Sequence, residues 1–191
     1  ANTSTVTNIP ISVSCWAKES GTSNNKMFIC VGLSGSAATC YSLETQSTPP
    51  RIGTVCRETD DSGATHDGLL SAIGSYPNVW RLYAAVFQSH TFRTSYLDGK
   101  AGAGSNGAIT TSATNMIRIS GDPVGTASSV LNIATTVAHV AVWNMELAVA
   151  DIAKLRYLYP NQVQLANLVN YWPLTGNQSP EPDYGSGNLP L

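Results

Sequence analysis

The feature that most constrains the fold of this chain is the alternation of apolar and small polar side chains along short segments. Residues 11–17, with the sequence ISVSCWA, alternate with a period of two, and residues 80–87, WRLYAAVF, are apolar on both faces. Successive side chains of a strand point to opposite faces of a sheet, so the first pattern predicts a half-buried strand and the second a central one. The chain is therefore expected to fold mainly into β-sheet.

Short strand patterns separated by turn residues recur along most of the chain. Residues 27–31 are predicted to form a strand that pairs with the strand at 11–17, across a turn at 18–26. Further strands are expected at residues 39–43, 51–57, 91–97, 116–119, 134–143 and 168–174. Many short strands without a repeat are typical of an all-β, two-sheet antiparallel β-sandwich of the jelly-roll class. Because 191 residues lie within the usual size of one domain, we expect a single domain over residues 1–191.

One segment has a different period. Ala148, Ile152, Leu155 and Tyr159 follow one another at helical spacing, which places them on one face of a helix. Pro160 lacks the N–H group that a helix interior needs, so it ends the pattern. The sequence therefore predicts one short amphipathic helix near residues 147–158.

The charge of the chain argues against two classes of partner. Charged residues make up only 12% of the sequence, and the 10 basic and 12 acidic residues give a formal net charge of -2. They are spread along the chain, so no basic patch matches a phosphate backbone. No apolar run approaches the roughly 20 residues of a spanning helix. We expect neither nucleic-acid binding nor membrane insertion.

The cysteines all lie in the first third of the chain, at Cys15, Cys30, Cys40 and Cys56. Their spacing contains no C-x-x-C pair, so a zinc site is not indicated. Cys15 and Cys30 stand among apolar residues, and cysteine is one of the most often buried residue types. We expect unpaired buried thiols, with three disulfide connectivities as the alternative.

Several segments together resemble a known family. They are WRLYAAVF at 80–87, YLDGK at 96–100, IRISG at 117–121, VAHVAVWN at 137–144, MELAVADIAKL at 145–155 and YWPL at 171–174. This order resembles the laminin-G-like, concanavalin A-like jelly-roll domains, and the resemblance implies a concanavalin A-like sandwich. Such domains usually begin with an additional strand that pairs with the last one, and only residues 1–10 are available for it here. They often carry an acidic residue at the position of His139.

An acidic segment at residues 58–61 is the nearest approach to a catalytic motif. Glycanases of the concanavalin A-like fold place two carboxylates on one strand in an E-x-D-x-x-E pattern, where one attacks and the other protonates. The segment reads ETDD, lacks the final Glu and is followed by a glycine-containing stretch. We therefore expect no catalytic residues and a protein that is not an enzyme.

The most polar segment is residues 58–68, ETDDSGATHDG, which is predicted to form a surface loop. Its side chains Asp60, Asp61 and Asp67 offer the hard oxygen ligands that calcium prefers. The resemblance also implies calcium, because laminin-G-like domains often hold such an ion. These three residues are the candidate metal ligands, a solvated loop is the alternative, and no other cofactor is expected.

Exposed rings are the candidates for ligand binding, because ring faces complement the apolar faces of pyranose sugars. Tyr76 and Tyr184 are flanked by Pro, Gly and Ser and are expected in exposed loops, and His66 in the polar segment is a third candidate. His139 is expected to be a hydrogen-bonded histidine within a strand. The tryptophans all lie in predicted strands and are expected in the core: Trp16, Trp80, Trp143 and Trp172.

Three functions are compatible with such a domain. The resemblance implies a virion structural protein, of capsid decoration or fibre type, because phage particles contain similar stand-alone modules. Such a protein would sit on the virion surface or in another extracellular setting, form a homo-oligomer and dock on protein subunits of a larger assembly. The alternative is a lectin-like module that binds glycans through loops at one end of the sandwich. A glycoside hydrolase is the third candidate, which the missing carboxylate pattern disfavours.

Overall fold

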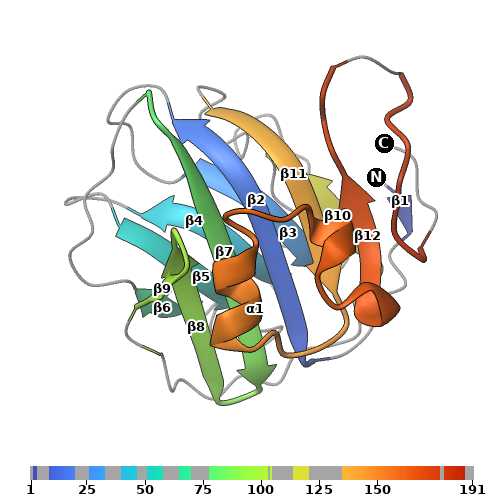
Figure 1. Ribbon diagram of the computed structural model, residues 1–191. Coiled ribbons are helices and arrows are strands. Elements are labelled where there is room, and N and C mark those ends of the chain that lie inside the picture. The colour runs from blue at the N-terminus through green and yellow to red at the C-terminus, as the bar shows by residue number, and fades with distance from the viewer. Residues whose placement is uncertain are drawn as a thin grey trace.

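The described strands form two six-stranded sheets that face each other in the computed structural model (Figure 1). The structure describes residues 2–3, 9–19, 26–32, 40–46, 51–57, 65–69, 78–102, 104, 114–120, 135–176 and 179–187. The rear sheet has the order β1 (Asn2–Thr3), β10 (Met116–Ile119), β3 (Lys26–Gly32), β4 (Cys40–Gln46), β5 (Arg51–Arg57), β6 (Thr65–Leu69). The front sheet has the order β12 (Leu168–Trp172), β11 (Thr135–Trp143), β2 (Ile11–Glu19), β7 (Trp80–Ser89), β8 (Phe92–Leu97), β9 (Lys100–Ala101). The predicted antiparallel β-sandwich is confirmed.

The core between the sheets follows from the period-two pattern of the central strands. β2 pairs with β11 on one side and with β7 on the other. Every second residue of β2, beginning with Ile11, is buried between the sheets, and the residues in between face the outer side of the front sheet. The rear sheet and the other front strands complete this core with Phe28, Ile29, Val31, Leu43, Tyr83, Phe87, Val140, Val142 and Trp172.

The predicted pairing of residues 27–31 with residues 11–17 is wrong. β3 pairs with β10 and β4 in the rear sheet. Both edges of β2 are already occupied by β11 and β7, so β3 lies across the core from β2 instead of beside it. β2 and β3 therefore lie in different sheets and are not paired as a hairpin.

The outer face of the front sheet is also apolar and is covered by residues 144–167 (Figure 1). This cover, named here the outer cover, contains α1 (Val149–Lys154), η2 (Pro160–Gln162) and η3 (Leu165–Asn167). Ile152 and Leu155 pack on the sheet, and Trp143 Nε1 donates a hydrogen bond of 3.0 Å to the Val163 carbonyl. None of the helices in the described part of the chain has the length and hydropathy needed to cross a bilayer.

The helix predicted near residues 147–158 exists but is shorter. α1 spans six residues, and turns follow from Leu155 to Tyr157. Tyr159 has an extended backbone, with φ -71° and ψ 151°, because the residue before a proline is disfavoured in the helical region. Pro160 then opens η2, where its missing N–H costs no hydrogen bond.

Three of the four cysteines are described with their side chains, and they confirm the predicted burial. Cys15 is a free thiol, and Cys15, Cys30 and Cys40 are all buried. Burial raises the pKa of the Cys15 thiol far above its usual value. Cys56 lies in β5, and its side chain is outside the described part of the structure.

The C-terminal segment covers the outer edge of β12. The first strand, β1, pairs with β10 in the rear sheet, so it does not protect this edge. Three backbone N–H groups of the segment donate to β12 carbonyls instead: Tyr184 to Tyr171, Ser186 to Leu168 and Gly187 to Val169. The Asp183 carboxylate accepts from the backbone N–H of Tyr171 at 2.8 Å and from Asn170 Nδ2 at 2.6 Å. Unpaired strand edges promote aggregation, and this segment blocks one.

Gly185 permits the close approach of this segment. A Cβ atom at this position would lie 2.3 Å from the Val169 carbonyl oxygen and 2.6 Å from the Asn170 Cα. Both are backbone atoms of β12, which cannot move without disturbing the sheet. Only glycine fits here without displacing the segment.

We expect Gly185→Ala to detach the C-terminal segment from β12. Steric crowding of this kind costs about 1–3 kcal/mol, and amide hydrogen exchange should accelerate at Tyr184 and Gly187. The control is Ser186→Ala, which removes a hydrogen bond of 3.0 Å to the Leu168 carbonyl but inserts no atom against the strand. Exchange rates in Gly185→Ala no faster than those in Ser186→Ala would show that this contact does not hold the segment.

Candidate functional site

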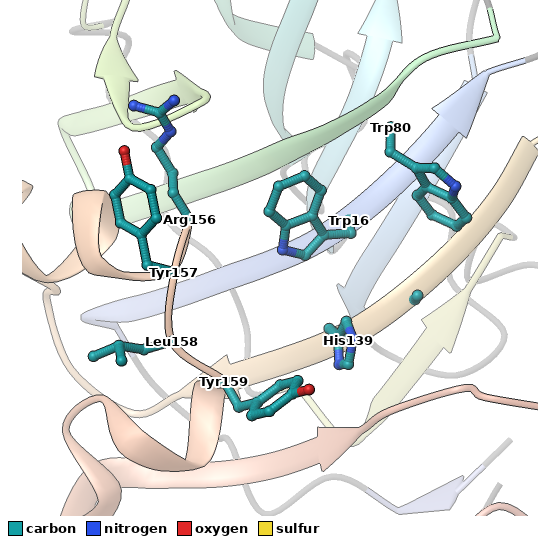
Figure 2. A pocket seen from close by; sticks show the side chains of 8 residues that line it. Trp16, Trp80, His139, Arg156, Tyr157, Leu158 and Tyr159 are labelled. Carbon is teal, nitrogen blue, oxygen red and sulfur yellow. The ribbon is translucent and has the colours of Figure 1, made fainter.

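The outer cover leaves part of the front sheet open, and two adjoining hollows lie there. The larger has a volume of about 420 Å³ and the smaller about 270 Å³. The larger is lined by Trp16, Trp80, Ala138, His139, Arg156, Tyr157, Leu158 and Tyr159 (Figure 2). The smaller is lined by His139, Tyr159, Asn161, Tyr171, Pro173, Thr175 and Tyr184. Both hollows are bordered by His139 and Tyr159, so they lie side by side, and together they are called here the aromatic groove.

Two tryptophans on neighbouring strands form the floor and one end of the larger hollow. Trp16 lies on β2 opposite Ala138 of β11, and Trp80 begins β7 opposite Lys18. Figure 2 shows Trp16 in the middle of the group, with Trp80 on one side and Arg156 and Tyr157 on the other. Trp80 is 41% exposed and Trp16 is half-buried, so both rings offer surface to a ligand.

A β-bulge in β11 brings His139 into the groove. Ala138 pairs with Trp16 and Ala141 with Ser14, so β11 carries one residue more than β2 over this stretch. His139 has a φ of 51°, in the left-handed region, where histidine is enriched among non-glycine residues. Bulges of this kind redirect a side chain. Ala138 and His139, although consecutive, therefore both line the groove.

His139 connects the rings of the two hollows. Its Nδ1 is hydrogen-bonded to Tyr171 Oη at 2.9 Å, as expected for a histidine within a strand. Its ring centroid lies 5.2 Å from that of Tyr159 and 6.2 Å from that of Tyr171, and Tyr171 in turn lies 6.2 Å from Tyr184. These contacts give a row of rings along the groove.

Burial keeps these groups uncharged near neutral pH. Desolvation lowers the pKa of His139 below its ordinary value of 6.5. It also raises the pKa of Tyr171 to about 12, with smaller contributions from the nearby Tyr159, Tyr184 and Glu181. The centre of the groove therefore presents a neutral imidazole and a protonated phenol.

The groove offers ring faces and hydrogen-bonding groups but no acidic side chain among its described lining residues. Apolar walls with a few polar groups are typical of small-molecule sites, and 420 Å³ lies within their usual range of volumes. In the described part of the chain, no three His, Cys, Asp or Glu side chains lie close enough to hold a metal ion. The arrangement is suited to binding through stacking and hydrogen bonds.

One sequence-predicted site residue lies in the groove. Tyr184 is 52% exposed and lines the smaller hollow, and its role in binding is a proposal taken up below. Tyr76, Asp60 and Asp61 lie outside the described residues, so the calcium site stays a prediction. The described structure does not bring either of the other two candidates, His66 and Asp67, to the groove.

The loop predicted over residues 58–68 is wrong at its C-terminal end, where His66 and Asp67 lie in a strand. They belong to β6, which pairs with β5 through Cys56↔His66 and Val55↔Asp67. β6 is the last strand of the rear sheet, and polar residues are common on such edge strands because they discourage pairing with other chains. High polarity therefore did not indicate a loop in this part of the segment.

The prediction for the tryptophans is half right. Trp143 and Trp172 are fully buried, as expected. Trp80 is wrong as a core residue, because it is exposed on the outer side of the front sheet. Trp16 is partly buried: it packs against the outer hydrophobic cluster and also lines the groove. His139 was also missed as a groove residue, although the spacing of three between Val137 and Val140 interrupts the period of two and marks the bulge.

We expect the burial of His139 to make the protein less stable in mild acid. Its folded-state pKa is depressed, so the unfolded chain takes up a proton first as the pH falls below 6.5. The contribution to the free energy of unfolding that is present above pH 6.5 is therefore lost as the pH falls toward the folded-state pKa of His139. His139→Asn, which tolerates the left-handed backbone, should lose less stability than the wild type between about pH 8 and about pH 5.

Urea denaturation at both pH values measures this difference. Tyr171→Phe is the matched control, because it removes the hydrogen-bond partner but keeps the buried imidazole, and it should retain the pH dependence of the wild type. Equal losses of stability in the wild type and in His139→Asn would show that His139 does not cause the loss of stability in acid.

The comparisons with known proteins agree with this architecture. A solved structure of a Bacteroides ovatus protein described as carbohydrate binding matches 99% of this chain and 56% of its own, with 15% identity and a TM-score of 0.66. The heptameric SAP-like pentraxin from Limulus polyphemus matches 81% of this chain and 72% of its own, with 11% identity and a TM-score of 0.62. The enzymatically active domain of tailspike protein 2 from bacteriophage CBA120 matches 92% of this chain and 28% of its own, with 14% identity and a TM-score of 0.64.

At these identities the structural matches show the fold alone, and this chain spans 56% and 28% of the length of the Bacteroides and bacteriophage chains. No curated protein sequence matches the chain. The family model of the concanavalin A-like lectin/glucanases superfamily, of laminin-G type, matches residues 1–153. The match covers most of the chain and agrees with the resemblance in the sequence, so the chain belongs to the concanavalin A-like lectin/glucanases superfamily.

Proposed function

We propose that this chain is a lectin-like module that binds an oligosaccharide in the aromatic groove. The observation that carries the proposal is the set of partly exposed rings that line the two adjoining hollows, formed by Trp80, Trp16, Tyr159 and Tyr184. Tyr184 was a candidate from the sequence, and the other rings come from the structure.

The chemistry of pyranose sugars fits this row of rings. One face of a pyranose ring is largely C–H, and it packs against an aromatic face while the hydroxyl groups stay at the rim. In the groove, Asn161, Thr175 and the Tyr159 hydroxyl stand beside the rings and can hydrogen-bond to sugar hydroxyls. Because the two hollows lie side by side, a linear chain of several sugars can contact both, whereas a single sugar occupies only one.

The same site favours binding over cleavage. Glycoside hydrolysis uses a pair of carboxylates on either side of the scissile bond. The described lining of the groove contains no Asp or Glu, and the neutral His139 is engaged with Tyr171. The absence of hydrolysis is therefore part of the proposal, although a tailspike domain of similar fold is enzymatically active.

The aromatic groove favours the lectin-like function over the virion structural role that was expected from the sequence. A decoration protein needs an assembly surface, whereas exposed rings in a sugar-sized depression point to a glycan. A place on a virion or another extracellular surface, homo-oligomeric assembly and docking on protein subunits all stay predictions. They are compatible with glycan binding, since a surface module can do both.

We expect Trp16→Ala and Tyr159→Ala each to weaken glycan binding about tenfold or more, because each removes a stacking face. The measurement is a glycan array followed by calorimetry on the strongest ligand. The control is Leu165→Ala, which truncates a side chain that is 61% exposed but lies outside the groove lining. It should leave the affinity unchanged.

Two outcomes would contradict the proposal. One is an array without a ligand for the wild-type protein. The other is a ligand whose affinity is the same in the wild type and in both groove variants, because it would then bind elsewhere. Release of reducing sugar from a bound oligosaccharide would reverse the conclusion on catalysis.

A further inference from the structure

We infer that the oligosaccharide held in the aromatic groove is acidic, and that Arg156 contacts its carboxylate or sulfate group. This inference rests on the proposed function and names the class of glycan that the groove selects. Two observations carry it. Two cationic residues stand beside the rings, and the nearby carboxylates already bind other groups of the protein.

Arg156 lines one end of the larger hollow. Its guanidinium carbon lies 5.3 Å from the centroid of the neighbouring Tyr157 ring, at the distance of a cation–π contact. Its aliphatic part passes close to the turn at Gly99, where a Cβ atom would lie 3.3 Å from Arg156 Cδ. Figure 2 shows Arg156 and Tyr157 together, across Trp16 from Trp80.

The charge of Arg156 is not neutralised within the described part of the chain. The nearby Asp98 carboxylate forms a salt bridge with Arg81 and accepts the Leu82 backbone N–H at 3.1 Å. On α1, the Asp151 carboxylate accepts from Lys154 Nζ and from Gln164 Nε2, both at 2.7 Å. These acids are held by other partners, so the guanidinium is available to a ligand.

A second cation, Lys18, stands beside Trp80 on the outer face, next to the residues that line the hollow. Lys18 pairs with Trp80 across β2 and β7, and it is two residues from Trp16 on the same face of β2. The next residue, Glu19, is buried on the opposite face, where it accepts a hydrogen bond from Tyr83. The outer face therefore carries positive charge around the tryptophans, although the whole chain has a formal net charge of -2.

This combination selects an anionic sugar. A planar guanidinium donates two parallel hydrogen bonds to a carboxylate or sulfate, which a neutral hydroxyl cannot match. A uronic acid or a sulfated sugar seated on Trp16 would present its ring face to the indole and its anion to Arg156. Lys18 would attract the next anionic group along the chain as a less directional point charge.

The test compares matched pairs of oligosaccharides that differ only in charge. The array contains uronate oligosaccharides beside their methyl esters and sulfated oligosaccharides beside their desulfated forms, so its two arms separate the two sources of anion. The acidic member of the best pair should bind about tenfold tighter than its neutral partner. Higher salt should reduce this difference.

Variants of Arg156 connect the preference to this residue. In Arg156→Gln, the affinity for the acidic partner should fall about tenfold, while the weaker binding of the neutral partner stays. Arg156→Lys should keep part of the preference for the acidic partner. The control Lys100→Gln removes one charge from the exposed end of the neighbouring hairpin, outside the groove lining, and should change the affinity less than about twofold. Unchanged melting temperatures show that the variants fold.

The outcomes separate this inference from the proposed function. Equal binding of acidic and neutral partners, or an acidic preference that survives Arg156→Gln, overturns the inference and leaves glycan binding in place. Loss of the preference in Arg156→Gln supports it. A wild-type protein that binds neither member of any pair overturns the proposed function as well.

Discussion

The arrangement of this protein depends on one constraint, which is that the front sheet is apolar on both faces. One face packs against the rear sheet, and the other must be kept from water by the outer cover of residues 144–167. Burial of apolar surface contributes about 25 cal/mol per Å², so an uncovered face would be strongly unfavourable. The cover nevertheless leaves the C-terminal end of β2 and the beginning of β7 open. The uncovered part is occupied by tryptophan and tyrosine, which combine apolar bodies with polar edges and tolerate partial exposure.

Two local features turn this exposed surface into a shaped site. The bulge in β11 directs His139 between the hollows, where it joins Tyr159 to Tyr171. The C-terminal segment, held against β12 by Asp183 and by the close approach of Gly185, carries Tyr184 to the far end. The groove is therefore built from segments distant in sequence. Its rings are positioned by strands and by a docked edge, which reduces the conformational entropy that a ligand must remove.

The sequence predicted the sandwich because period two is a direct consequence of strand geometry, and the strands from 80–87 to 168–174 stand near their expected places. It could not predict that β3 pairs within the rear sheet, because pairing depends on which strand edges are already occupied. It also could not separate Trp16 from Trp143. Both lie on apolar strands and both face the outer side of the front sheet, and only the extent of the outer cover buries one and exposes the other. The positive φ of His139 could not be predicted either, because it also depends on tertiary structure.

The claim that glycans bind on the uncovered face of the front sheet can be tested directly with the tryptophan indole N–H signals in a two-dimensional ¹H–¹⁵N NMR spectrum. Trp16 and Trp80 line the groove, whereas Trp143 and Trp172 are fully buried and Trp143 donates to Val163. During titration with an oligosaccharide selected on the array, the signals of Trp16 and Trp80 should shift and those of Trp143 and Trp172 should stay. Saturable binding that leaves the Trp16 and Trp80 signals in place would contradict the claim.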